Sequence, residues 1–86
     1  MKDVSYAQLP LHMREGIRGY YENGCPPGRF LNAILCNDLV GAASNADEIN
    51  KYALFTWAWF LYNELPRDAW GSQENVDTWI ASKREK

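Results

Sequence analysis

The stretch that decides the fold is the apolar run YALFTWAWFLY, which spans Tyr52 to Tyr62. Its side chains cover nearly the whole circumference of a helix, which predicts an element that is contacted from several sides. The aromatic content of 55–62 is also compatible with a strand, but the length and the Ala, Leu and Glu content favour a helix over about 46–65. Leu65-Pro66 ends this predicted helix, because the residue before a proline avoids helical backbone angles.

Amphipathic patterns predict three further helices around this central one. Residues 10–23 carry one apolar stripe, with Pro10 at the helix start and Gly24 as a left-handed cap. A second stripe runs over 27–42, and a third runs over 72–82 after Ser72 as the N-cap.

Two alternative capping pairs can begin the central helix, Ser44 with Asp47 or Asn45 with Glu48. The sequence therefore predicts an all-α fold, a compact bundle of about four helices around a central aromatic-rich helix. Residues 1–86 are expected to form a single domain, with 1–9 as a lead-in and 83–86 as a frayed tail.

Two tryptophans of the central helix point in different directions. Trp57 and Trp59 lie about 200° apart at 100° per residue, and a single layer of core does not reach both. Either the helix is sandwiched between two layers, or one tryptophan faces outward, where tryptophans are enriched at binding hot spots. We expect Trp57 and Phe60 to be among the best protected side chains.

Composition excludes several classes of function. The formal net charge is −2, which argues against a protein that binds nucleic acid by neutralising phosphates. The run from Tyr52 to Tyr62 is far shorter than the roughly 20 apolar residues of a membrane helix, and Met1–Pro10 has no apolar signal core. Cys25 and Cys36 are about 14 Å apart along a helix axis, too far for a disulfide.

The sequence contains no recognisable catalytic or metal-binding constellation, so we expect no enzyme, no cofactor and no metal. Cys25, Cys36 and His12 lack the paired spacing of a zinc site. His12 and Glu15 share a helical face and form a conceivable acid–base pair, although a lone solvated histidine is the simpler interpretation.

Two glycine-containing segments admit both a structural and a functional interpretation. Gly28 and Arg29, with Arg18, offer backbone N–H groups and positive charge to an anion, or Arg29 simply pairs with Glu22 or stays solvated. The pair at positions 16 and 19 interrupts the first helix, which suggests that a backbone or a bulky ring packs closely there.

The order of motifs resembles a family of small bacteriophage and prophage accessory proteins. The resemblance covers about residues 9–80 and rests on Leu9-Pro10-x-His12-Met13-Arg14-x-Gly16, Gly19-Tyr20, Asn23-Gly24-x-Pro26-Pro27-Gly28-x-Phe30-Leu31, Asn37-Asp38-Leu39, Ala46-Asp47-x-x-Asn50, Phe60-Leu61-Tyr62-Asn63-x-x-Pro66, Trp70-Gly71-Ser72 and Trp79-Ile80. It brings no catalytic residue with it. It implies a bacterial host cytoplasm and an accessory role during infection.

Taken together, these features predict a protein that binds a host or phage protein without catalysis, in host takeover or counter-defence. The alternatives are a small nucleic-acid-binding regulator and a homo-oligomeric assembly factor, since a homodimer can use the same surface. The predicted partner-binding surface combines the start of the second helix with aromatic side chains nearby: Arg18, Tyr20, Tyr21, Gly28, Arg29, Trp57 and Trp59.

Overall fold

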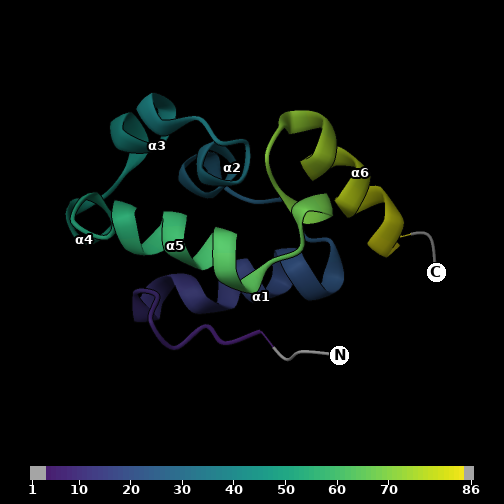
Figure 1. The fold of residues 1–86 in the computed structure, drawn as a ribbon, viewed down its shortest axis with the longest axis horizontal. Coiled ribbons are helices and arrows are strands. Elements are labelled where there is room, and N and C mark those ends of the chain that lie inside the picture. The colour runs from purple at the N-terminus through teal and green to yellow at the C-terminus, as the bar shows by residue number, and fades with distance from the viewer. Residues whose placement is uncertain (1–3, 85–86) are drawn as a thin grey trace.

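The computed structural model describes residues 4–84, and within that range it contains helices and no strand. Two 3₁₀ turns accompany six α-helices (Figure 1). In chain order the elements are η1 (Leu11–Met13), α1 (Arg14–Asn23), α2 (Arg29–Leu35), α3 (Leu39–Asn45), α4 (Glu48–Lys51), α5 (Leu54–Glu64), η2 (Arg67–Ala69) and α6 (Gln73–Arg84). The predicted all-α class is confirmed, whereas the expected number of about four helices is too low.

Helix α5 runs through the middle of the molecule, with α1 on one side and α2 and α3 on the other (Figure 1). Helix α6 closes one end, where it packs against α1 and α2. The described C-terminal end of the chain lies at this end, while the lead-in segment runs along the outer side of α1 (Figure 1). The aromatic-rich helix is therefore central, as the sequence predicts.

The continuous helix predicted over 27–42 is wrong, because the chain breaks after Leu35. Asn37 adopts a left-handed backbone angle, φ 64°, which asparagine tolerates better than most residues. The Asp38 carboxylate then accepts a hydrogen bond from the backbone N–H of Gly41 at 2.9 Å and caps α3. This break lets α3 pack back against α2, and both helices lie on the same side of α5 (Figure 1).

The continuous helix predicted over 46–65 is also wrong, because it divides at Tyr52 and Ala53. Neither expected capping pair forms. Asp47 is itself the N-cap of α4, and its carboxylate accepts from the backbone N–H of Asn50 at 2.7 Å. Helix α5 then begins one turn later and ends before Pro66, as predicted.

The core forms where α1, α2, α5 and α6 meet. Trp57 makes edge-to-face contacts with Phe30 and Phe60, at ring-centroid distances of 5.8 Å and 6.1 Å. The hydroxyl of Tyr20 donates to the backbone carbonyl of Ala69 at 2.6 Å, so its one polar atom is satisfied inside the core. Trp57 and Phe60 are fully buried, which confirms their predicted protection.

Two further predicted helix ends are correct, whereas the predicted close packing at the helix-one glycines is not found. Gly24 has φ 71° and caps α1, and the hydroxyl of Ser72 accepts from the backbone N–H of Asn75 at 3.1 Å. A side chain at Gly16 would meet nothing within 4 Å. At Gly19 the nearest atom is the Cys25 sulfur at 3.6 Å, an ordinary contact.

Candidate interaction surface

The outward face of α5 is a row of aromatic side chains. Phe55, Trp59 and Tyr62 follow a spacing of i, i+4 and i+7, which places them on one side of the helix. Their exposed fractions are 81 %, 48 % and 79 %. Trp57 on the opposite side is fully buried, so of the two alternatives for the tryptophan pair, the one with an outward tryptophan is confirmed. Helix α5 is contacted by α1 on one side and by α2 and α3 on the other, as predicted, and its remaining side is open to solvent.

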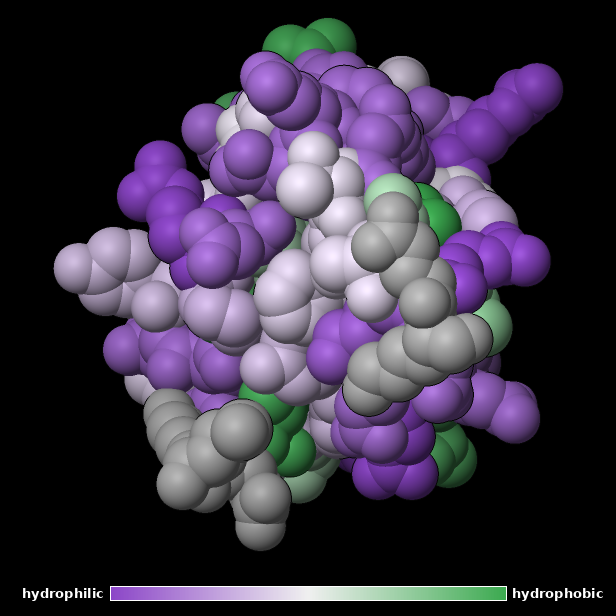
Figure 2. Space-filling view, turned by 90° about the vertical axis from the view of Figure 1, so that its right-hand side faces the viewer, coloured by the Kyte–Doolittle hydropathy of each residue, from purple (hydrophilic) through white to green (hydrophobic). Residues whose placement is uncertain are grey.

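Other large apolar side chains are exposed in the segments that precede α5, and Leu39 among them shares a groove with Tyr62. We define the α3–α5 face as the exposed apolar residues of these neighbouring segments: Leu39, Val40, Ile49, Tyr52, Phe55, Trp59 and Tyr62. Single exposed apolar residues are normal on a protein surface, but several together are typical of an interaction site. By contrast, the face at the α6 end is mostly hydrophilic (Figure 2).

Charged side chains are scarce in helices α3 and α5, whereas Glu48 and Lys51 of α4 flank Ile49 and Tyr52. Helix α3 contains none, and the only one in α5 is Glu64 at its end. The centres of protein–protein interfaces are likewise rich in aromatic residues and poor in charge. The composition of this face therefore matches the buried centre of an interface better than it matches an ordinary solvated surface.

A groove of about 250 Å³ lies between α3 and α5. It is lined mainly by apolar side chains: Ile34, Asn37, Asp38, Leu39, Ala42, Leu54, Ala58, Leu61, Tyr62 and Trp70. Small-molecule sites usually measure about 300–1,000 Å³, so this groove suits one or two side chains better than a cofactor. The buried indole N–H of Trp70 has no acceptor among residues 4–84.

Two of the residues predicted for partner binding belong to the core, and their assignment to a surface is wrong. Tyr20 and Trp57 are both fully buried. Each satisfies its polar atom internally, Tyr20 through Ala69 and Trp57 through Asn50. Tyrosine and tryptophan are typical of interfaces, but the positions of Tyr20 and Trp57 on their helices turn both side chains toward the interior.

Arg18 lies in a cluster with Tyr6 and Glu22. Its guanidinium is 3.8 Å from the Glu22 carboxylate and 5.2 Å from the centre of the Tyr6 ring. The Tyr6 hydroxyl donates to Glu22 at 3.1 Å, and partial burial together with this bond raises the Tyr6 pKa. Arg18 thus attaches the lead-in segment to α1.

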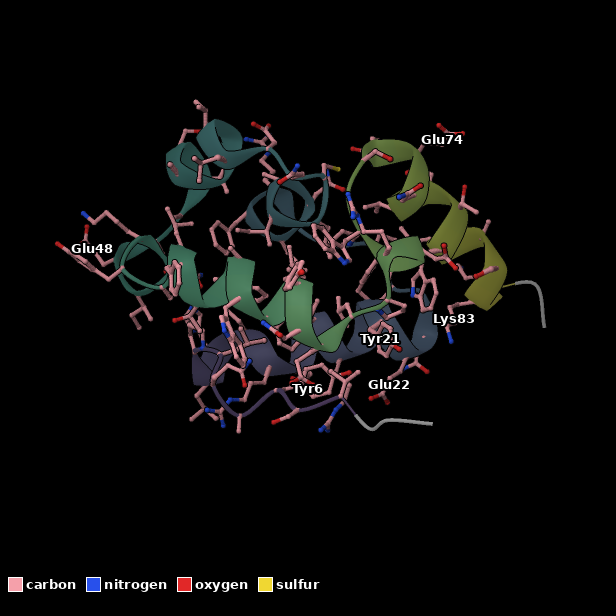
Figure 3. The ribbon with its side chains drawn as sticks, in the orientation of Figure 1. Tyr6, Tyr21, Glu22, Glu48, Glu74 and Lys83 are labelled. Carbon is pink, nitrogen blue, oxygen red and sulfur yellow. The ribbon has the colours of Figure 1, made fainter. Side chains whose placement is uncertain are left out.

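Tyr21 is partly covered by α6. Its ring stacks on Trp79 at 5.3 Å, nearly parallel, and the Lys83 ammonium lies 4.8 Å from the Trp79 ring. Figure 3 shows Tyr21 and Lys83 close together, with Glu22 and Tyr6 beside them at the same end of α1. Trp79 also donates its indole N–H to the Tyr21 carbonyl at 3.0 Å. These contacts are internal, so Tyr21 serves the packing of α6.

Gly28 and Arg29 are exposed at the start of α2. Of the two structural alternatives for Arg29, the pair with Glu22 does not form, because Glu22 engages Arg18 and Tyr6, and the exposed Arg29 fits the solvated one. No carboxylate in the described part of the chain lies within 4 Å of Arg29. The structure therefore does not gather the predicted site into one patch, and Trp59 is its only member on the α3–α5 face.

His12 pairs with Asp47 rather than with Glu15. Its Nε2 lies 2.8 Å from the Asp47 carboxylate, and both side chains are about half exposed. The Asn50 backbone N–H, followed by His12, holds the pKa of Asp47 below its usual value. Within residues 4–84, no hydroxyl or thiol is hydrogen-bonded to His12. The pair joins η1 to the start of α4.

Cys25 and Cys36 are both free thiols, and the Cys36 thiol donates a hydrogen bond to Gln73. Burial raises the pKa of the Cys36 thiol, whose sulfur lies 3.3 Å from the side-chain oxygen of Gln73. Among the described residues, no three metal-ligating side chains come together.

Sequence signals for the α3–α5 face were present but incomplete. The angular separation of Trp57 and Trp59 required one outward ring, yet it did not show which ring that would be. The helix break at Asn37 exposes Leu39 and Val40, which a continuous helix would orient differently.

In the part of the chain that the structure describes, no helix has the length and apolarity needed to span a membrane. No family model, curated protein or solved structure matches this chain.

Proposed function

We propose that this chain works by binding another protein through the α3–α5 face, without catalysing a reaction. The observation that carries the proposal is the exposed row of Phe55, Trp59 and Tyr62 on one side of α5. Exposed aromatic side chains are costly to leave in water, and tryptophan and tyrosine are the residues most enriched at binding hot spots.

The size of the face supports a stable contact. A large aromatic side chain buries about 150–250 Å², so Tyr52, Phe55, Trp59 and Tyr62 at their observed exposures offer about 400–700 Å². A standard interface buries about 800 Å² on each partner. Leu39, Val40 and Ile49 extend the apolar area toward that value.

The resemblance to bacteriophage and prophage accessory proteins supports a biological setting for this proposal. In that setting the chain acts in the cytoplasm of an infected bacterium, and its partner is a host protein bound during host takeover or counter-defence. The alternative of a nucleic-acid-binding regulator finds less support. Arg14, Arg18 and Arg29 could form only a small basic face for nucleic acid. Arg14 donates to the backbone carbonyls of Leu9 and Ala7, and Arg18 pairs with Glu22, so two of these three arginines already have internal partners.

The proposal is tested by capture from a bacterial lysate with three forms of the purified chain. The first is unaltered, the second carries Phe55→Ser and Trp59→Ser, and the third carries Leu11→Ser. Leu11 is 77 % exposed on η1 and is the matched control for an exposed apolar residue outside the α3–α5 face. We expect one protein to be retained by the unaltered and the Leu11→Ser chains and lost with the double variant. Retention by all three forms would contradict the proposal.

A further inference from the structure

The groove between α3 and α5 is continuous with the aromatic row. Ala58 and Tyr62 line the groove and also belong to the outward side of α5, while Leu39 stands on the opposite wall. A partner that covers the row can therefore place a side chain in the groove without moving the backbone. The volume of about 250 Å³ fits one large apolar side chain or two small ones.

The spacing of the row fits a helical partner. Phe55 and Tyr62 are seven residues apart, which is about 10 Å or two turns along α5. Apolar side chains at i, i+3 or i+4, and i+7 of a second helix cover the same length, and an amphipathic helix in an apolar groove is a recurring mode of recognition. Residues 4–84 form no sheet, so they provide no strand edge for an extended peptide.

The charge at the groove selects among such helices. Asp38 is the only charged residue that lines the groove, and its side chain is exposed. Its carboxylate accepts from the Gly41 backbone, and within the described chain no cation lies within 4 Å of it. A lysine or arginine of the partner supplies the missing opposite charge, and an acidic flank is repelled.

A second copy of this chain matches the groove less well. The copy would present the same Asp38 and the same apolar row. The nearby cation of this region, Lys51, is already paired with Glu48 at 3.1 Å. Two copies face to face therefore bring acidic groove edges together without supplying a free cation.

We infer that the α3–α5 groove receives an amphipathic helix of another protein, with an apolar anchor between Leu39 and Tyr62 and a basic residue beside Asp38. This inference rests on the proposed function and adds the chemistry of the partner to it.

The test uses two synthetic helical peptides with identical leucines at i, i+3, i+4 and i+7, flanked by lysines in one and by glutamates in the other. Each is titrated into the isotope-labelled full chain at low salt and followed by amide NMR shifts. We expect the lysine peptide to bind more tightly and to shift amides of Leu39, Ala42, Ala58 and Tyr62. Ala58→Trp, which fills the groove, is expected to weaken its binding about tenfold.

Asp38→Asn isolates the charge, because asparagine is as good an N-cap as aspartate and keeps α3 in place. We expect it to weaken binding of the lysine peptide about twofold to fivefold. Glu74→Gln removes a carboxylate of α6 that does not line the groove, and it should leave the binding unchanged (Figure 3).

Four results would overturn the inference: equal affinity for both peptides, shifts centred elsewhere, no binding, or a groove occupied by a second copy in sedimentation and NMR. Each is distinguishable from failure of the proposed function. That proposal depends on capture of a natural protein by the aromatic row, and it stands if Phe55 and Trp59 remain necessary for that capture.

Discussion

Trp57 donates its indole N–H to the side-chain oxygen of Asn50 at 3.0 Å, and both side chains are buried. Asn50 lies in α4 and Trp57 lies in α5, so this bond crosses the break between the two helices. Asn50 is the only buried polar residue found among the described side chains. The short helix α4 is thereby held against the core.

Replacing Asn50 with leucine is expected to destabilise the fold, because it leaves the Trp57 N–H buried without an acceptor. The loss should be about 1–3 kcal/mol of unfolding free energy, measured by urea denaturation. Trp57→Phe removes the donor and provides the second side of a double-mutant cycle. If Asn50→Leu costs as much in the Trp57→Phe background as in the unaltered chain, the hydrogen bond is not the cause.

Alanine substitution of two phenylalanines of α5 should change the stability of the fold by very different amounts. Phe60 is fully buried and Phe55 is 81 % exposed. Phe60→Ala should lower the free energy of unfolding by about 3–5 kcal/mol. This is a large part of the total for a typical domain, which is about 5–15 kcal/mol. Phe55→Ala should change the melting temperature little. Similar losses in both variants would show that the outward face of α5 is wrongly assigned.

Alanine substitution should stabilise the chain at one glycine and destabilise it at another. Gly16 lies in α1 with open space around it, so Gly16→Ala should add about 0.5–1 kcal/mol. At Gly24, with φ 71°, a Cβ would come within 2.7 Å of the Lys83 Cβ and 3.0 Å of the Ile80 carbonyl. Gly24→Ala should therefore lower stability. Calorimetry that finds both variants equally stable would contradict the packing of α6 on the α1 cap.

The ionisation of Asp47 should make the stability of the fold depend on pH at acidic values. Its pKa is lowered in the folded chain, first by the Asn50 backbone N–H and then by His12. The stabilisation is therefore present above the ordinary carboxyl pKa of about 4 and is lost as the pH falls through the lower folded value. Asp47→Asn keeps the cap and removes the charge, so its melting temperature should fall less steeply below pH 4. Identical pH profiles would argue against the His12–Asp47 link.

The helical class could be predicted because Pro10, Gly24 and Pro66 mark helix ends and the apolar stripes have helical spacing. The breaks at Asn37 and at Tyr52–Ala53 were missed for a physical reason. Neither site contains glycine or proline, and the apolar stripe runs through both. Asn37-Asp38 did carry a signal, since asparagine tolerates left-handed angles and aspartate caps the next helix.

The candidate site was only partly predictable, because exposure depends on which helices pack on which side. Trp57 and Trp59 had to point in different directions, but only the packed structure shows that Trp57 is the inner one. Arg18 and Tyr21 have the residue types of an interface, yet the rings of Tyr6 and Trp79 engage them internally. Pairings between segments far apart in the sequence cannot be obtained from local patterns.

The central claim is that the aromatic row of α5 binds a protein, and it is tested most directly by calorimetric titration of the captured partner. Trp59→Ala is expected to weaken binding by about 2 kcal/mol, or roughly thirtyfold, while the circular dichroism of the chain stays helical. Arg29→Ala, at the start of α2, separates this row from the surface that the sequence suggested, and it should leave the affinity unchanged. An affinity that is unchanged in folded Trp59→Ala, or lost in Arg29→Ala alone, would contradict the account.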